Sequence, residues 1–144
     1  MTAHNNVQTG LMGTYDANNT YFMADGKTAY GYGATTLFTF SYDNDMVSVQ
    51  QDPQGTGVSS ISNKTGGTFT LTINQMSPFN QVLDKLADER RPGGFPIDAC
   101  DGSRHYVGAH GYIQKKADGG AANEAGERTW TIKALNVVEN SVLN

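Results

Sequence analysis

The chain has 144 residues, a formal net charge of -4 and a sequence pI near 5.2. This length favours one domain spanning 1–144, and the acidic balance argues against a protein that grips nucleic acid through its phosphates, while allowing one that nucleic acid passes without binding. A single cysteine, Cys100, excludes an intrachain disulfide and a cysteine-based metal cluster, and we expect neither a signal peptide nor a membrane span.

The N-terminal part of the chain predicts an arm followed by a short strand pair. Residues 1–10 are polar and show no periodicity, so we expect a flexible N-terminal arm. A first strand pair is expected around Asn18-Asn19, ending at the turn Asp25-Gly26.

A clearer pattern of alternation follows at 37–50. Aromatic residues alternate with Leu, Thr and Ser as far as Tyr42, and the extended pattern resumes at 46–50 after an Asp-Asn-Asp interruption. Two extended runs joined by a short polar turn predict a hairpin over 37–50. The next stretch, 51–66, is rich in Gly, Ser and Thr, which predicts a long loop or a loose second hairpin.

The most legible segment contains a strand and then a helix. Apolar residues alternate with Thr and Asn over 68–74, which is typical of a half-buried strand. Ser77 and Pro78 then form a helix start, and Pro92 stops the helix, so we predict a helix over 77–91. Its apolar stripe is predicted to pack on the strands through Phe79, Val82, Leu83 and Leu86.

The remaining sequence predicts three more strands. Two of them, at 95–100 and 104–114, flank a turn at Asp101-Gly102. A last strand is predicted over RTWTIKALNVVEN at 128–140, where apolar residues alternate with Thr and Lys over 129–134. The expected fold class is therefore mainly β: a β-sandwich or barrel of two antiparallel sheets, with one flanking helix at about 77–91.

No set of residues predicts catalysis. His105 and His110 lie near Asp98 and Asp101, but five residues apart on one strand they point to opposite faces and cannot share an ion. Cys100 precedes a carboxylate, which disfavours a thiolate, so we take it as structural. We therefore expect no enzymatic activity, no cofactor and no metal site.

The polar positions of the predicted strands share one chemical character. They carry Thr, Ser, Gln and Asn where an exposed sheet face usually carries Lys and Glu. Two explanations stand equally: the strand preference of threonine, or a sheet face or edge that is shared between subunits. These positions are Thr39, Ser41, Ser48, Gln50, Thr68, Thr70, Thr72, Asn74, Thr129 and Thr131.

Two segments, in this order, resemble the tail-tube proteins of contractile-tailed bacteriophages. The first is GTFTLTINQMSPFNQVLDKLADE at 67–89, and after a short strand pair the second is YIQKKADGGAANEAGERTWTIKALN at 112–136. The family is similar in its order of an alternating strand, a Ser-Pro helix start and a closing strand with tryptophan. The resemblance covers roughly residues 35–136, whereas the first 34 residues match more weakly.

The resemblance implies a structural protein, similar also to the tubes of type VI secretion. Six copies would form a ring, and rings would stack into a hollow tube that delivers DNA to the host. Its partners would be further copies of itself and the tail sheath, baseplate and tail-terminator proteins, with DNA passing through the lumen without specific binding. The protein would belong to the phage tail of the virion and would assemble in the host cytoplasm.

Two other functions remain open from the sequence. One is the inner tube of a contractile injection system that carries protein effectors. The other is a carbohydrate-binding tail-fibre or adhesin β-sandwich, which is favoured by clustered tyrosines at Tyr15, Tyr21, Tyr30 and Tyr32.

Overall fold

This computed structural model describes residue 10 and residues 13–142, which form ten strands and one α-helix. A short 3-10 helix, Ala17–Asn19, precedes the first strand. In chain order the elements are β1 Tyr21–Ala24, β2 Lys27–Thr28, β3 Phe38–Tyr42, β4 Val47–Gln51, β5 Gly57–Ile61, β6 Gly67–Asn74, α2 Phe79–Glu89, β7 Phe95–Cys100, β8 Arg104–Ile113, β9 Glu127–Leu135 and β10 Val138–Ser141.

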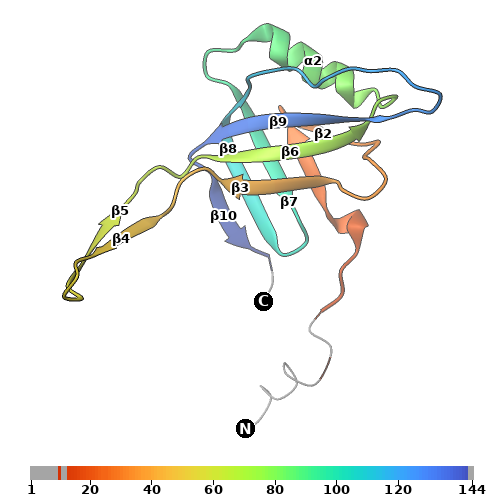
Figure 1. Ribbon diagram of the computed structural model, residues 1–144. Coiled ribbons are helices and arrows are strands. Elements are labelled where there is room, and N and C mark those ends of the chain that lie inside the picture. Colours follow the sequence, from red (N-terminus) through yellow and green to blue (C-terminus); the bar gives the residue numbers. More distant parts are fainter. Residues whose placement is uncertain (1–9, 11–12, 143–144) are drawn as a thin grey trace.

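The strands form two antiparallel sheets. Eight of them make one sheet in the order β2-β1-β7-β8-β9-β6-β3, with β10 also paired to β8, and β4 and β5 make a separate hairpin. Figure 1 shows β3, β6 and β9 in front, crossing β7 and β8 behind. We call β3, β6 and β9 the front layer, and β1, β7, β8 and β10 the back layer. The predicted mainly β fold with two antiparallel sheets and one helix is confirmed.

The sheet folds over on itself because β9 and β10 act as one interrupted strand. Both pair with β8 in the same continuous register, from Ile113 opposite Ile132 to Arg104 opposite Ser141. Between them Asn136 has a left-handed backbone with φ of 52°, and its side chain accepts a hydrogen bond from Thr65 at 3.3 Å. This local bend carries the chain from the front layer to the back layer.

The core lies between the two layers and follows the alternation that the sequence predicts for β6. Phe69, Leu71 and Ile73 are fully buried, while the residues between them point outward and are half-buried. Burying side chains of this size stabilises the fold by about 1.5–3 kcal/mol each. Trp130 and Ile132 from β9 complete the front side of the core.

Helix α2 covers one open side of the two layers (Figure 1). As predicted, Phe79, Leu83 and Leu86 are buried, and the half-buried Val82 packs against the same core. The helix is shorter than the predicted 77–91, because Arg90 adopts a left-handed backbone with φ of 48° that ends it after Glu89. No helix within residue 10 and residues 13–142 has the length and apolar character needed to cross a membrane.

The start of the helix was also predicted to lie two residues earlier. Ser77 precedes the helix, and its hydroxyl accepts a hydrogen bond from the backbone N–H of Phe79 at 3.3 Å. The same hydroxyl donates to the carbonyl of Tyr30 at 2.7 Å. Ser77 therefore satisfies one free N–H group, as the sequence suggests, and also ties the helix start to the loop between β2 and β3, which contains Tyr30.

The predicted hairpin over 37–50 is wrong. The apolar face of β3, with Phe38 and Phe40, packs on the core, so β3 pairs with β6 instead of β4. β4 then pairs with β5, which lies inside the stretch predicted as a loop or a loose second hairpin, 51–66. Alternation predicts a strand but does not name its partner, which tertiary packing decides.

The predicted strand pair around Asn18-Asn19 is also displaced. These residues lie in the 3-10 helix, which is capped by the Asp16 carboxylate accepting from the N–H of Asn18 at 2.9 Å. The actual pair, β1 and β2, flanks the turn at Asp25-Gly26 that was expected to end it. The predicted arm, 1–10, lies outside the described residues except for Gly10.

Asn80 ties the helix to the front layer and is the buried polar group that the apolar pattern did not reveal. Its side-chain amide donates to the carbonyls of Asn74, Gln75 and Ser77 at 3.0–3.2 Å. Its oxygen accepts a hydrogen bond of 3.0 Å from the indole N–H of Trp130. Asn80 is only 3% exposed, so water cannot replace these partners.

We expect Asn80→Ala to lower the free energy of unfolding by about 3 kcal/mol, because it leaves the buried Trp130 indole N–H and the Gln75 carbonyl without the partners that Asn80 supplies. Denaturant titration followed by tryptophan fluorescence measures this change. Gln81→Ala, on the exposed side of the same helix turn, serves as the control and should change stability by less than about 0.5 kcal/mol. Equal effects of the two substitutions would contradict the role of Asn80.

Candidate assembly surfaces

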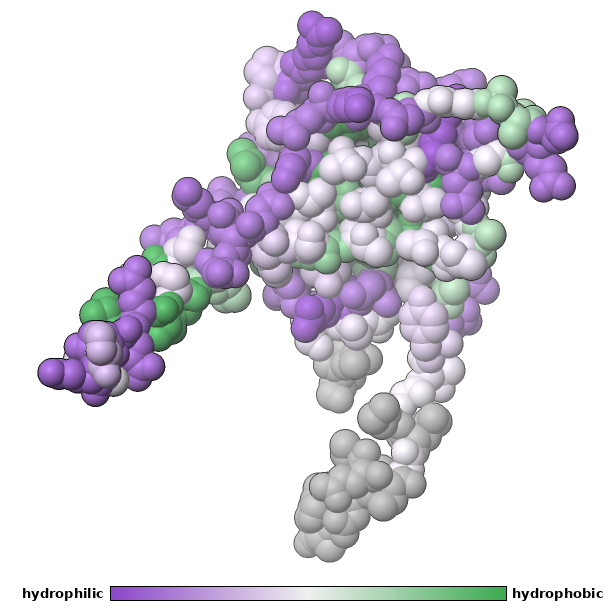
Figure 2. Space-filling view, viewed as in Figure 1, coloured by the Kyte–Doolittle hydropathy of each residue, from purple (hydrophilic) through white to green (hydrophobic). Residues whose placement is uncertain are grey.

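The outward side of the front layer is a surface of hydroxyl side chains. Thr39 on β3 lies opposite Thr70 on β6, which lies opposite Thr131 on β9. Directly opposed residues point to the same face, so these three form a row across the layer. We call the whole surface the threonine face, and it consists of Thr39, Ser41, Thr68, Thr70, Thr72, Asn74, Thr129 and Thr131. Its nearly neutral colour over β3, β6 and β9 is visible in Figure 2.

Eight of the ten polar positions singled out in the sequence therefore come together. Ser48 and Gln50 do not join them, because β4 leaves the front layer and pairs only with β5. The face instead continues onto β8, where Tyr112 lies opposite Lys133 and His110 lies opposite Leu135. Alternation in β8 alone could not show this continuation, since it depends on the pairing of β8 with β9.

Charge is sparse on the threonine face. Within β3, β6 and β9, which lie wholly in the described range, the charged residues on this side are Glu127 and Lys133. Glu127 lies opposite Asn74 at the end of the face, and its carboxylate accepts a hydrogen bond from the backbone N–H of Ala34 at 2.9 Å. The ammonium group of Lys133 lies 3.3 Å from a carboxylate oxygen of Asp43, and the other oxygen of Asp43 accepts from the Thr68 hydroxyl at 2.8 Å. The positive charge is thus neutralised locally, so this surface offers little attraction to phosphates.

The β4–β5 hairpin is a second candidate surface, and it projects away from the body of the protein (Figure 1). All ten residues of its two strands are exposed. Five apolar residues of the hairpin have between 50% and 79% of their surface open to solvent: Met46, Val47, Val49, Val58 and Ile61. Figure 2 shows the hydrophobic colour along this element. Exposed apolar residues that gather on a projecting element mark an interaction surface.

A polar cluster closes the end of the two layers opposite to the helix. The phenol of Tyr42 on β3 donates to the Glu139 carboxylate on β10 at 2.9 Å, and Arg104 pairs with the other Glu139 oxygen at 3.1 Å. Burial and the hydrogen bond to Glu139 raise the pKa of Tyr42 to about 12. Phe40 stacks on Tyr106 beside this cluster, so β3 is joined to the back layer by both polar and aromatic contacts.

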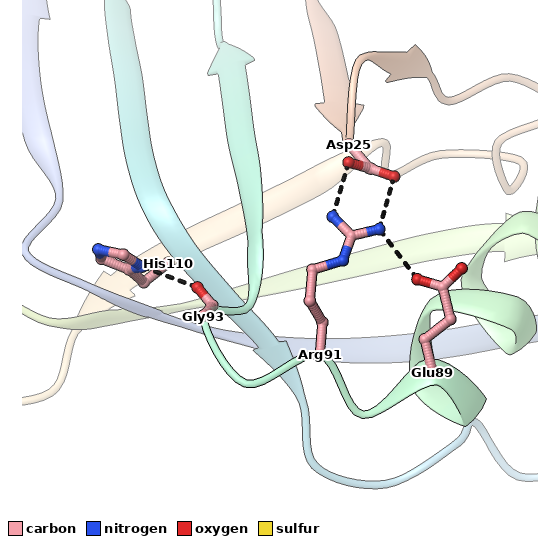
Figure 3. Close-up of polar contacts among 5 residues, drawn as sticks. All are labelled: Asp25, Glu89, Arg91, Gly93 and His110. Atoms are coloured by element: carbon pink, nitrogen blue, oxygen red, sulfur yellow. Dashed lines mark hydrogen bonds and ion pairs between the residues drawn. The ribbon is translucent and has the colours of Figure 1, made fainter.

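The histidines lie in two separate places, as their spacing on β8 predicts. His105 hydrogen-bonds the Asp98 carboxylate, which also accepts from Tyr21 at 3.2 Å. His110 contacts the Gly93 carbonyl at 2.7 Å through Nδ1 (Figure 3). Among the described residues, no group of three or more His, Cys, Asp or Glu side chains is placed to hold a metal ion. Cys100 is buried.

The four tyrosines that favoured a carbohydrate site each contact different parts of the protein. Tyr15 is 70% exposed, whereas Tyr30 packs edge-on against Phe79 of the helix. Tyr21 is bound to Asp98, and Tyr32 packs against the core. No ring contact joins any two of these four within the described residues, so they do not form one aromatic platform.

Comparison with known proteins bears on the fold. No protein-family model and no curated protein sequence matches the chain. Among solved structures, it is similar to the anti-feeding prophage cap, the AFP tube terminating cap, with a TM-score of 0.62 at 9% identity over 92% of this chain and 95% of that one.

Two structures of an extracellular contractile injection system, PVC, are also similar. The sheath/tube terminator matches with a TM-score of 0.57 at 11% identity over 89% of this chain and 97% of that one. A chain of the sheath-tube complex matches with 0.58 at 9% identity over 99% of both chains. At these identities the likeness establishes a shared fold, which occurs in structural components of tube and sheath assemblies.

We expect the stability of the protein to fall as pH rises from 10 to 12, in part through Tyr42. In that window the native state keeps the phenol proton while the unfolded chain loses it, so the unfolded state binds fewer protons. Tyr42→Phe should make this decline shallower, as measured by denaturant titrations at successive pH values. Tyr15→Phe, at an exposed tyrosine, is the control and should leave the decline unchanged; the same decline in Tyr42→Phe would refute the role assigned to Tyr42.

Proposed function

We propose that this chain is a structural subunit of a contractile tail or a tail-like injection system, and that six copies form a ring and rings stack into a hollow tube. In this proposal the threonine face lines the lumen and the β4–β5 hairpin reaches the adjacent ring. The chain has a structural role and no catalytic one.

The observation that carries the proposal is the hydroxyl-rich threonine face on a fold shared with tube and sheath components. A lumen lined by hydroxyl groups forms no lasting ion pairs with the phosphates of DNA, so DNA can slide through it. Lys133 does not alter this argument, because Asp43 neutralises it. The same hydroxyl-rich surface would also suit protein effectors, so this argument applies equally to a tube that carries DNA and to one that carries proteins.

The edges of the sheet support ring formation. β3 lies at one end of the eight-stranded order and β2 at the other, so the backbone groups on the outer side of each have no strand partner within the described chain. Unpaired strand edges are templates for pairing with another chain, and closure into a ring removes them. Tail sheath, baseplate and tail-terminator proteins would be the partners of such a tube in a virion-like particle assembled in the host cytoplasm.

A tube terminator is the second candidate, and it is favoured by the similarity to the anti-feeding prophage cap and the sheath/tube terminator. A repeating subunit has a head-to-tail interface that propagates without limit, whereas a terminator presents only one side of that interface. The two candidates therefore differ in whether one ring binds the next.

We expect the purified protein to form hollow rings, and tubes whose length grows with protein concentration, in negative-stain electron microscopy alongside size-exclusion chromatography. Single rings that never stack but bind the ends of tubes would favour the terminator. A protein that stays monomeric at all concentrations, even with a baseplate seed, and binds glycans would contradict both and favour the adhesin.

Thr131→Lys tests which surface faces the lumen. Thr131 is exposed at the centre of the threonine face, so the substitution would add one lysine per subunit to the channel wall without disturbing the core. We expect tubes of normal shape that bind short double-stranded DNA about tenfold more tightly at low salt and protect it from nuclease.

The matched control for this experiment is Gln81→Lys, at an exposed residue of α2. It adds the same charge away from the threonine face and should give no nuclease protection. Equal protection by the two variants would mean that the threonine face does not line the channel.

A further inference from the structure

The tip of the β4–β5 hairpin carries a carboxylate, Asp52, with one oxygen held by hydrogen bonds and the other oxygen available to a partner. One oxygen of Asp52 accepts hydrogen bonds from the backbone N–H groups of Gln54 at 2.9 Å and Thr56 at 2.8 Å. The side-chain amide of Gln51 also donates to the carbonyl of Gly55 at 2.8 Å, which stiffens the turn. The second oxygen of Asp52 makes no hydrogen bond within the described residues. An ordered acceptor of this kind loses little conformational entropy when it binds a donor.

The hairpin exposes five apolar side chains and carries one negative charge. From Met46 to Ser62 its sole ionisable side chain is that of Asp52. An isolated two-stranded hairpin with its apolar residues in water is at best marginally stable, so a covering partner would stabilise it. The partner that fits is an apolar groove with a free cation at its rim.

Such a groove lies at the C-terminal end of α2. Its volume is about 440 Å³, and the residues that line it include Leu86, Ala87, Phe95, Tyr112 and Ile113, with Arg90 among them. We call it the helix-end groove. It lies between the helix and β8, and the left-handed turn at Arg90 that ends the helix places this residue at its border.

Arg90 is the cation that remains available there. Its neighbour Arg91 is already engaged, with the Asp25 carboxylate at 3.0 Å and the Glu89 carboxylate at 2.9 Å (Figure 3). Those contacts fix the chain after the helix against the β1–β2 turn. Arg90 forms neither an ion pair nor a side-chain hydrogen bond with any residue in the described part of the chain.

The geometry points to the helix-end groove as the site that receives the β4–β5 hairpin of a second copy of this chain, with Asp52 of the hairpin paired to Arg90 at the groove. This inference rests on the proposed function and names the contact between adjacent rings. Both complementary parts, an apolar element with a free carboxylate oxygen and an apolar groove with a free guanidinium group, are present on the same chain. A pairing between copies is head-to-tail, so it propagates.

Two features favour a second copy over closure within one molecule or a different groove. The hairpin points away from its own body, so it does not reach its own helix-end groove (Figure 1). Another sizeable groove, of about 490 Å³, lies at the root of the hairpin, and Lys64 and Lys133 are among the residues that line it. Lys133 is already paired there with Asp43, which leaves only Lys64 as a rival for Asp52.

Charge reversal and rescue test the pairing. We expect Asp52→Lys and Arg90→Glu each to raise the protein concentration needed for tube formation about tenfold, since each places like charges together. The double variant Asp52→Lys/Arg90→Glu should assemble near the wild-type concentration, because it restores an opposite pair. Lys64→Glu is the matched control and should assemble as wild type does. Asp52→Lys also removes the acceptor of the Gln54 and Thr56 N–H groups. Asp52→Ala loses the same turn hydrogen bonds without placing like charges together, so it should impair assembly less than Asp52→Lys does. Circular dichroism and thermal melting check that the body of each variant stays folded.

A cross-linking experiment gives a second and independent readout. A Gln54→Cys chain mixed with an Ala87→Cys chain should yield covalent dimers with a short bis-maleimide, while neither chain alone should; Cys100 is buried and does not compete. A mixture of Gln54→Cys with Asn63→Cys, at the hairpin root, should remain uncross-linked.

The outcomes separate this inference from the proposed function. Wild-type tubes with unaffected single variants, no rescue, or cross-linking to position 63 would overturn the docking site and leave the tube proposal standing. A wild-type protein that forms no ring or tube under any condition would overturn both. Loss of assembly in both single variants, together with rescue by the double variant, would establish the pairing.

Discussion

The hydrogen bonds of Asn80 are the constraint on which the rest of the structure depends. The strand β6 ends and the helix begins within a few residues, so the chain turns sharply at this junction. The Asn80 amide donates to three carbonyls of the junction, two of which also accept a backbone N–H, and its oxygen accepts a hydrogen bond from the Trp130 indole of β9. One buried side chain thereby stabilises the sharp turn and fixes the helix against the front layer. Because the helix occupies that open side, the core is enclosed there and the outer side of the front layer stays free.

The two ends of the layered body are closed in different ways. At one end the apolar stripe of α2 covers the core, and Arg91 anchors the chain that follows by ion pairs to Asp25 and Glu89. At the other end Tyr42, Glu139 and Arg104 join β3 to the back layer by polar contacts. The β4–β5 hairpin thus contributes no buried residue to the body of the protein, because its strands are exposed throughout. An element that adds no core contacts and yet exposes five apolar side chains has the features of an interaction surface.

The layered body and the β4–β5 hairpin also differ in how their charged side chains are paired. Lys133 and Asp43 neutralise each other beside the threonine face, and Lys116 is paired with Asp88 of the helix. The charges left unpaired at Asp52 and Arg90 lie on two separate apolar surfaces of the same chain. These two charges have opposite signs, so the two surfaces are electrostatically complementary to each other in a second copy of the chain.

The sequence by itself determined the elements whose signal is local. Alternation in 68–74 identified β6, the apolar stripe identified the buried side of the helix, and the threonine positions of β3, β6 and β9 followed from the same period of two. It could not determine which strand pairs with which, because pairing is decided by contacts between distant residues: β3 packs on the core through Phe38 and Phe40 and so leaves β4 to β5. Asn80 looked like an ordinary polar helix residue, since only the tertiary fold brings Trp130 to it. The helix-end groove likewise exists only where the end of α2 meets β8, two segments that are separate in the sequence.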